Sequence, residues 1–320
     1  MKFAYHNSDF KKADLVLFGL PDESGSHAER KGSARGPDSI RKASQRNIYK
    51  FHGGRAIYEP EIGTFNQKLH DFGNINRKDL PKIFSKLGNK TPIFLGGDHS
   101  ITFDILKNMK NKIVSRNNVK GHEIASHLCT LTRDVSASIS LETQTSQHLL
   151  SKDDMQKISV VYFDAHPDAS YSKKPYYGSV VSDLSDLKNI DLKSSILIGT
   201  RAATDEENFS LQEFGLKTIR SQEIEEKGIK HVLNEIKGTV GKNIYLSIDL
   251  DVCDPAFAPG VSSPVPGGLT GRELIFFARH VAKLGLIGFD IVEHTPKFDA
   301  QEMTAHLAAN LILEIVSNLP

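Results

Sequence analysis

Three short segments of the sequence contain side chains that commonly bind metal ions. Asp164, His166 and Asp168 alternate along the chain, and in an extended segment this spacing places all three side chains on one side. Asp249 and Asp251 repeat the same spacing. The third segment, Gly-Gly-Asp-His, adds one imidazole after two glycines, which permit a sharp turn or close packing of the backbone. The candidate metal ligands are His99, Asp164, His166, Asp168, Asp249 and Asp251.

This set of residues favours a site for two divalent cations. Four clustered carboxylates would repel one another, and some would stay protonated unless cations balanced them. Oxygen-rich ligation with some imidazole favours Mn²⁺ over Zn²⁺, although Co²⁺, Ni²⁺ and Fe²⁺ also suit it. Two such ions about 3.5–4 Å apart can share one water and lower its pKa, which makes hydroxide available at neutral pH.

A purely structural interpretation is available for each residue taken alone. A single Asp at the end of a strand usually caps a turn or a helix. A single His is usually a hydrogen-bonded surface or core residue. The combination of an alternating Asp-His-Asp, an Asp-Leu-Asp and a Gly-Asp-His segment favours metal binding over these ordinary roles.

The elements that must position these residues can be predicted from hydrophobic patterning. Short apolar runs of the kind found in strands buried on both faces precede the polar segments; they cover residues 15–18, 93–95, 160–163, 196–198, 244–248 and 286–292. Helical spacing occurs at residues 37–46, 101–109, 222–236, 271–284 and 303–316. Alternating strands and helices predict a doubly wound parallel sheet, in which ligands bind beyond the carboxyl ends of the strands. The candidate ligands occupy those positions.

Composition restricts the class of protein. Forty basic and 39 acidic residues among 320 argue against a nucleic-acid binder, which normally shows a basic excess. Cys129 and Cys253 lie far apart and form no metal-binding pair, as suits a reducing compartment. No signal-peptide pattern and no apolar run of the ~20 residues that span a bilayer is present. We therefore expect a soluble cytoplasmic protein that binds no nucleic acid and no membrane.

We expect a single domain over residues 1–320, interrupted by a polar insertion at about 113–157. The insertion is rich in Ser, Thr, Asn, Gln and Lys and is long for a connection. A surface insertion without catalytic function is the simpler interpretation, and a functional lid is the alternative.

Taken together, the motifs resemble those of the ureohydrolase family, which contains arginases, agmatinases and their relatives. Its three metal motifs are matched by residues 96–100, 164–168 and 247–251. Further matches lie at residues 32–37, 40–41, 254–260, 290–293 and 304–309, and Pro-Gly-Gly-Leu at 266–269 is typical of agmatinase-like members. The resemblance covers the chain from about residue 13 to its end, except for the insertion. It implies a three-layer α/β/α sandwich around a mainly parallel sheet of about eight strands.

The resemblance also implies a role for each site residue. One Mn²⁺ would be held by His99, Asp164, Asp168 and Asp249, and the other by His166, Asp164, Asp249 and Asp251. Asp168 would orient the attacking hydroxide and pass its proton to the leaving amine. Glu293 would bind the guanidinium through paired charged hydrogen bonds, unless it forms an ordinary salt bridge at a strand end.

One position departs from the family pattern. Many relatives carry His-Gly-Thr after the second metal motif, whereas this chain has Tyr177-Gly178-Ser179. Tyr177 would then replace a histidine in substrate binding, or it would simply pack. A phenol with a pKa near ~10 transfers protons poorly at neutral pH but can donate a hydrogen bond. The nearby Lys173 and Lys174 would suit an anionic substrate tail better than a second amine, unless they are only solvated loop charges.

The expected function is hydrolysis of a guanidino C–N bond by two Mn²⁺ per chain, with agmatine as the leading substrate, giving putrescine and urea. Arginase, guanidino-acid hydrolase and formiminoglutamase activities are the alternatives within the family. A metal-dependent deacetylase and a non-catalytic relative are more distant alternatives; such deacetylases usually bind a single zinc through histidine pairs. The resemblance further implies a homo-oligomer, a trimer or a hexamer, acting on a small guanidino molecule.

Overall fold

Eight short strands form one sheet in which every pairing is parallel. The computed structural model describes residues 1–46, 48–51, 54–57, 66–109 and 157–320. In spatial order the strands are β4 (Leu69–Asn74), β1 (Leu15–Leu20), β5 (Thr91–Gly96), β10 (Leu286–Val292), β9 (Ile244–Asp249), β6 (Ser159–Phe163), β7 (Ile196–Thr200) and β8 (Lys217–Arg220). The parallel sheet of about eight strands expected from the sequence is confirmed.

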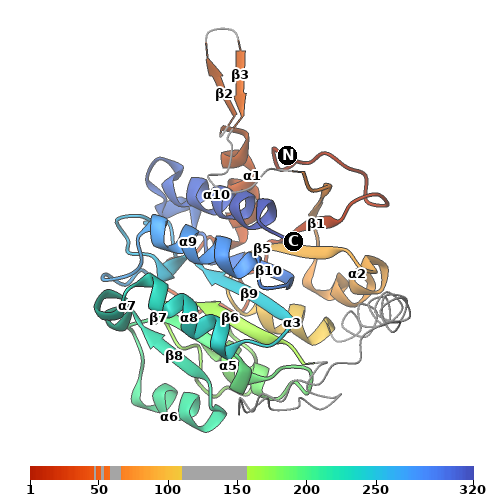
Figure 1. The fold of residues 1–320 in the computed structure, drawn as a ribbon. Helices are drawn as coiled ribbons and strands as arrows, with labels where there is room; N and C mark the ends of the chain where they lie inside the picture. The colour runs from red at the N-terminus through yellow and green to blue at the C-terminus, as the bar shows by residue number, and fades with distance from the viewer. Residues whose placement is uncertain (47, 52–53, 58–65, 110–156) are drawn as a thin grey trace, which may run out of the picture.

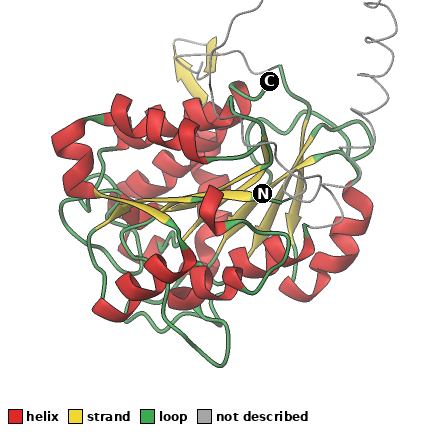
Figure 2. Cartoon of the chain, turned by 60° about the horizontal axis from the view of Figure 1, so that its bottom comes forward, coloured by secondary structure: helices red, strands yellow, loops and turns green. Residues whose placement is uncertain are grey.

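Helices cover both faces of this sheet, and the two layers follow from the alternation of side chains along each strand (Figures 1 and 2). Leu15 and Leu17 of β1 enter one core, whereas Val16 and Phe18 enter the other. The first core is closed by α1 (Gly36–Arg46), α7 (Ser221–Lys227), α8 (Ile229–Thr239), α9 (Gly271–Ala282) and α10 (Met303–Ser317). The second is closed by α2 (Leu80–Leu87), α3 (Ile101–Asn108), α5 (Val180–Ser185) and α6 (Asp205–Phe214). The three-layer architecture is thereby confirmed.

Several helix boundaries are set by local side-chain chemistry. Thr204 and Glu207 form a capping box at the start of α6, with Glu207 N donating to Thr204 Oγ1 at 3.2 Å and Thr204 N donating to Glu207 Oε2 at 3.0 Å. Thr270 and Glu273 form the same arrangement at α9. Helix α6 ends at Gly215, which adopts the left-handed conformation that glycine accepts without strain.

The prediction of one helix over residues 222–236 is wrong. The chain forms α7 and α8 instead, separated at Gly228, which has φ 79° and ψ 155°. These angles cannot continue a helix, and only glycine adopts them readily. The glycine therefore acts as a break rather than as a tolerated helical position.

A short antiparallel pair lies outside the main sheet and was not predicted. It consists of β2 (Ile48–Phe51) and β3 (Gly54–Ile57) (Figure 1). The proposed insertion at 113–157 lies outside the described residues except for Lys157, so its role and the single-domain organisation stay predictions. Among the helices of the described part, none has the length and apolarity needed to cross a membrane.

Candidate metal and catalytic centre

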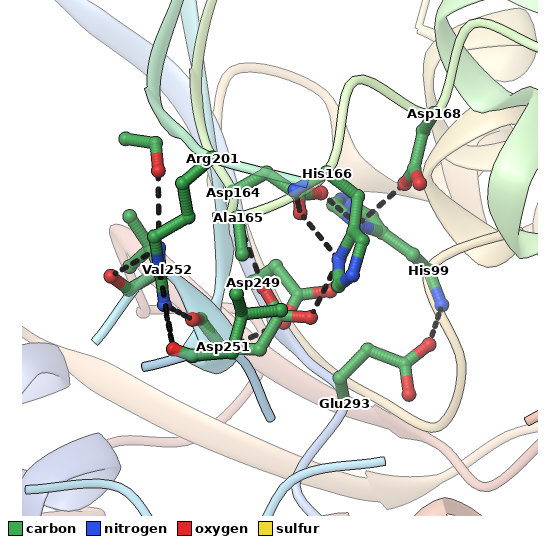
Figure 3. A network of polar contacts seen from close by, with 12 residues as sticks. His99, Asp164, Ala165, His166, Asp168, Arg201, Asp249, Asp251, Val252 and Glu293 are labelled. Atoms are coloured by element: carbon green, nitrogen blue, oxygen red, sulfur yellow. Dashed lines mark hydrogen bonds and ion pairs between the residues drawn. The ribbon is translucent and has the colours of Figure 1, made fainter. Parts of the chain in front are cut away.

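Four neighbouring strands in the middle of the sheet end at the same edge, and each is followed by candidate site residues. The strands are β5, β10, β9 and β6. His99 follows β5, Glu293 follows β10, Asp249 ends β9, and Asp164 comes directly after β6. Because carboxyl ends of parallel strands meet at one edge, residues far apart in the sequence converge there. Figure 3 shows these side chains gathered around one another.

The turn after β5 is shaped by its glycines. A Cβ at Gly97 would lie 1.9 Å from the carbonyl oxygen of Asp22, so no larger residue fits. The Gly97 N–H donates to the Leu20 carbonyl at 2.9 Å, and the Gly97 carbonyl accepts from Glu293 N at 2.9 Å. These bonds connect β1, β5 and β10 and hold the backbone that presents His99.

The imidazole of His99 faces three carboxylates at once. Its Nδ1 lies 3.0 Å from Asp164 Oδ2, 3.1 Å from Asp249 Oδ2 and 3.2 Å from Asp168 Oδ2. The His99 side chain is fully buried. One nitrogen surrounded by three carboxylate oxygens is an arrangement that a cation can occupy.

A second imidazole faces the other side of the same cluster. His166 Nδ1 lies 3.0 Å from Asp251 Oδ2 and 3.5 Å from Asp164 Oδ1. Backbone groups hold both carboxylates, with His166 N donating to Asp164 Oδ1 at 2.7 Å and Ala165 N donating to Asp251 Oδ1 at 3.1 Å. Asp164 thus contributes to both groups of candidate ligands, one with His99 and Asp168 and the other with His166 and Asp251.

The electrostatics of the cluster fit divalent cations. Burial raises the pKa of both Asp249 and Asp251, with further contributions from the charges of Asp251 and Asp164 at Asp249 and from Asp164 at Asp251. The carboxylates outweigh burial at the imidazoles, raising the pKa of His166 to about 12 and that of His99 well above its usual value. Asp164 Oδ2 is buried and accepts no hydrogen bond from the described residues. Two cations shared by these side chains would offset the repulsion between the carboxylates and would give this oxygen a partner.

A buried polar network behind His99 was not recognised from the sequence. His99 Nε2 lies 3.0 Å from Ser247 Oγ, and that hydroxyl donates to Asp290 Oδ1 at 2.7 Å. Asp290 Oδ2 also accepts from Tyr245 at 2.7 Å and from Thr102 at 2.9 Å. Because the Ser247 proton is given to Asp290, its oxygen can accept from His99 Nε2–H. This leaves Nδ1 without a proton, so its lone pair can face a cation.

Tyr162 also supports the site, although its place in the apolar run at residues 160–163 gives it only the pattern of an ordinary strand residue. Its ring stacks on His99 with centroids 4.6 Å apart and planes 13° apart. Its hydroxyl donates to Asp168 Oδ2 at 3.2 Å. Asp168 itself has a left-handed φ of 49°, a conformation that is costly for a residue other than glycine. Tyr162 therefore holds the carboxylate of a residue whose backbone is already fixed in an unusual shape.

Glu293 stands beside the cluster as a separate buried carboxylate. It also has a left-handed φ, 65°. Its Oε1 accepts from the His99 N–H at 2.8 Å, and its Oε2 accepts from Ser262 Oγ at 2.5 Å. Burial, with a contribution from the charge of Asp98, raises the pKa of Glu293 to about 8. No lysine or arginine forms an ion pair with it among the described residues, so it can receive an external cation.

Tyr177 lies near these acidic groups. Its backbone N–H donates to the Gly25 carbonyl at 3.1 Å, and its ring contacts those of Tyr176 and His27 at 5.6 Å and 6.2 Å between centroids. Burial, followed by the charges of Asp168 and Glu293, raises the pKa of its phenol. Lys173 and Lys174 are exposed in the preceding loop, which agrees with their interpretation as solvated charges.

Comparisons of the sequence and of the fold with known proteins lead to the same family. A profile described as "Arginase family" matches residues 13–317. The chain is 27% identical over 327 residues to a protein named agmatinase from Enterobacter sp. (strain 638), covering 99% of this chain and 90% of that protein. Agmatine ureohydrolase of Thermoplasma volcanium superposes with a TM-score of 0.73 at 25% identity, covering 99% and 93% of the two chains. Proclavaminate amidino hydrolase from Streptomyces clavuligerus gives 0.75 at 25%, covering 99% and 96%.

Proposed function

The chain belongs to the arginase family of hydrolases, which act on guanidino C–N bonds, and within that family we propose that it hydrolyses agmatine to putrescine and urea. One observation carries the proposal: six candidate metal ligands and a buried glutamate, which has no cationic partner among the described residues, converge at the carboxyl ends of four adjacent strands. Agmatine is favoured over other guanidino compounds by the agmatinase-like Pro-Gly-Gly-Leu segment and by relatives that carry that name.

The proposed cofactor is a pair of Mn²⁺ ions. His99, Asp164, Asp168 and Asp249 would hold one, and His166, Asp164, Asp249 and Asp251 would hold the other. The contacts of 3.0–3.5 Å between each imidazole and its carboxylates support this assignment, since a shared cation would draw these atoms around itself. When bound, such a pair lowers the pKa of a shared water. Oxygen-rich ligation favours Mn²⁺ among the possible metals.

The side chains then divide the remaining work. Glu293 would bind the guanidinium, and the substrate's positive charge would compensate a carboxylate that is only 3% exposed. Asp168 would take the proton released by the attacking water and deliver it to the leaving amine nitrogen. The hydrogen bond from Tyr162 keeps Asp168 Oδ2 oriented for this transfer. Tyr177 would donate a hydrogen bond to the substrate rather than transfer a proton.

We further propose that the enzyme works in the cytoplasm, in polyamine metabolism, as a homo-oligomer, a trimer or a hexamer. These assignments rest on the family and on the agmatinase relatives.

A substrate panel tests the proposed function. Protein loaded with Mn²⁺ is incubated with agmatine, arginine, guanidino acids, formiminoglutamate and an acetyl-lysine peptide. Urea, formamide and acetate are then measured. We expect urea from agmatine at the highest kcat/KM, and a large loss in Glu293→Gln. If arginine, a guanidino acid or formiminoglutamate gave the highest kcat/KM, the proposed substrate would be wrong and that compound would take its place. Acetate release would show that the reaction is deacetylation and not guanidino hydrolysis. If the chain binds metal but turns over no substrate, it is a non-catalytic relative.

A further inference from the structure

Arg201 has a role that its position in the sequence does not suggest. It comes directly after β7, and its half-buried guanidinium contacts the backbone at the end of β7 and in two other segments (Figure 3). No carboxylate forms an ion pair with it in the described part of the chain. Its contacts are with backbone carbonyl oxygens: Gly199 at 3.0 Å, Asp251 at 2.7 Å, Val252 at 3.2 Å, Cys253 at 3.1 Å, Val265 at 2.6 Å and Pro266 at 3.2 Å.

These carbonyls belong to the end of β7, the turn after β9 and the loop before α9. The five N–H donors of a guanidinium lie in one fixed plane, so one arginine can connect three segments. The loop before α9 closes tightly over it. A Cβ at Gly268 would lie 2.5 Å from Arg201 Nη2 and 2.5 Å from the Val252 carbonyl oxygen, so this position requires glycine. Part of the Pro-Gly-Gly-Leu segment thus serves to accommodate Arg201.

The same network reaches a candidate metal ligand by two paths. Arg201 Nη2 holds the Asp251 carbonyl oxygen at 2.7 Å. The Arg201 backbone N–H donates to the Ala165 carbonyl at 2.9 Å, and Ala165 N donates to Asp251 Oδ1 at 3.1 Å. With its carbonyl and one carboxylate oxygen fixed, Asp251 directs its other oxygen at His166 Nδ1, 3.0 Å away.

The imidazole of His99 depends on a different support. It is held by Ser247, and through it by Asp290, neither of which contacts the Arg201 side chain in the described network. The His99 imidazole is therefore held through Ser247 and the turn that carries Asp251 through Arg201, and the two halves stay linked by Asp249, whose Oδ1 accepts from the Asp251 N–H at 2.8 Å.

We propose that Arg201 is a positioning residue that selectively sets the affinity of the cation site formed by His166 and Asp251. This inference rests on the proposed two-cation function. A lysine could bond to only some of these carbonyls and a methionine to none. Either change would loosen the turn that carries Asp251, while the backbone path through Ala165 N–H to Asp251 Oδ1 would remain. The His99 side would keep His99, Asp164 and Asp168, whose side chains accept no bond from the Arg201 guanidinium in the described part of the chain.

The experiment counts Mn²⁺ ions per folded chain as a function of Mn²⁺ concentration in wild type, Arg201→Lys and Arg201→Met. We expect wild type to bind two ions. Both variants should bind the first normally and require about 10–100-fold more Mn²⁺ for the second, the range usual for loss of a group that orients a ligand. At intermediate concentration the variants should give the electron paramagnetic resonance spectrum of an isolated Mn²⁺. Adding His99→Asn should abolish the remaining ion, whereas adding His166→Asn should not.

Arg279→Met is the matched control. Arg279 is also a buried arginine, but it pairs with the Glu314 carboxylate between α9 and α10, at 2.8 Å. It should lose stability and still hold two ions per folded chain.

Wild-type affinity for both ions in Arg201→Lys would overturn the inference. So would loss of both ions together, or loss of the second ion in Arg279→Met as well. If Arg201→Met does not fold, Arg201→Lys decides the outcome. Absence of urea release by wild type would overturn only the proposed reaction, whereas a wild-type count of one ion would overturn the two-cation site and this inference together.

Discussion

Replacing Ser247 with alanine removes the hydroxyl that joins His99 to Asp290. The Ser247 side chain is fully buried, and its oxygen lies 3.0 Å from His99 Nε2 and 2.7 Å from Asp290 Oδ1. In the variant, the imidazole loses the acceptor that keeps its proton on Nε2. The tautomer that presents Nδ1 to the carboxylates is then no longer favoured.

The size of the effect follows from the bonds that are lost and those that remain. A hydrogen bond to a charged group contributes about 1.5–3 kcal/mol, and about 1.4 kcal/mol corresponds to a tenfold change in affinity. We therefore expect the Mn²⁺ bound by His99 to dissociate about 10–100-fold more readily. Asp290 keeps its bonds from Tyr245 and Thr102, so the fold should survive with a loss of about 1–3 kcal/mol.

The assay is competition for Mn²⁺ between the protein and a chelator of known affinity, with thermal unfolding measured on the same samples. Ser210→Ala is the control, because Ser210 is also fully buried but donates to the Glu206 carbonyl within α6. Wild-type Mn²⁺ affinity and activity in Ser247→Ala would refute the argument that this hydroxyl fixes His99. An equal loss of affinity in Ser210→Ala would show that a general change in stability is responsible.

Three further predictions concern separate parts of the structure. Glu293→Gln should lower kcat/KM for agmatine about 10–100-fold through loss of a charged hydrogen bond of ~1.5–3 kcal/mol, while Mn²⁺ content stays at two; steady-state kinetics and metal analysis check this. Asp71→Asn removes the buried carboxylate that pairs with Arg41 and, among the described residues, leaves it only the exposed Asp38 at 3.5 Å, which should cost about 3–5 kcal/mol at pH 7. Burial opposes ionisation of Asp71, but the hydrogen bonds and charge of Arg41 outweigh it and lower the pKa of this carboxyl in the folded protein. The ion pair therefore stabilises the fold fully above the ordinary pKa of 3.8, and this contribution disappears as the pH falls through the pKa of Asp71 in the folded protein. Urea unfolding from pH 7 to pH 3 should show the variant approaching wild type only below 3.8. Tyr177→Phe should lower kcat/KM about fivefold if its hydroxyl donates to substrate, at a net ~1 kcal/mol, and unchanged kinetics would remove Tyr177 from the site.

The candidate ligands could be predicted because the evidence for them is local. Asp164, His166 and Asp168 alternate directly after an apolar run, and parallel strands bring such ends to one edge of a sheet. Their supports could not be predicted in the same way. Ser247 and Asp290 are 43 positions apart, and they meet only because β9 and β10 are neighbours in the sheet. Hydrophobic periodicity does not predict the order of the strands in the sheet.

Two other misses have local causes. Residues 222–236 carry continuous helical spacing, and periodicity alone does not reveal that Gly228 adopts a positive φ. Arg201 follows the predicted strand at residues 196–198, and its residue type alone indicates no role there. Its side chain bonds to backbone carbonyls of segments 50 to 65 positions away. Because every residue has a backbone carbonyl, such contacts produce no pattern of side-chain types in the sequence.

The most direct test of the central claim is an anomalous difference map from crystals grown with Mn²⁺, recorded near the manganese absorption edge. Two peaks per chain are predicted, about 3.5–4 Å apart. One should lie within bonding distance of His99 Nδ1 and the other within bonding distance of His166 Nδ1, with Asp164 contacting both. A single peak, or two peaks that do not share Asp164, would contradict the two-cation centre on which the proposed hydrolysis depends.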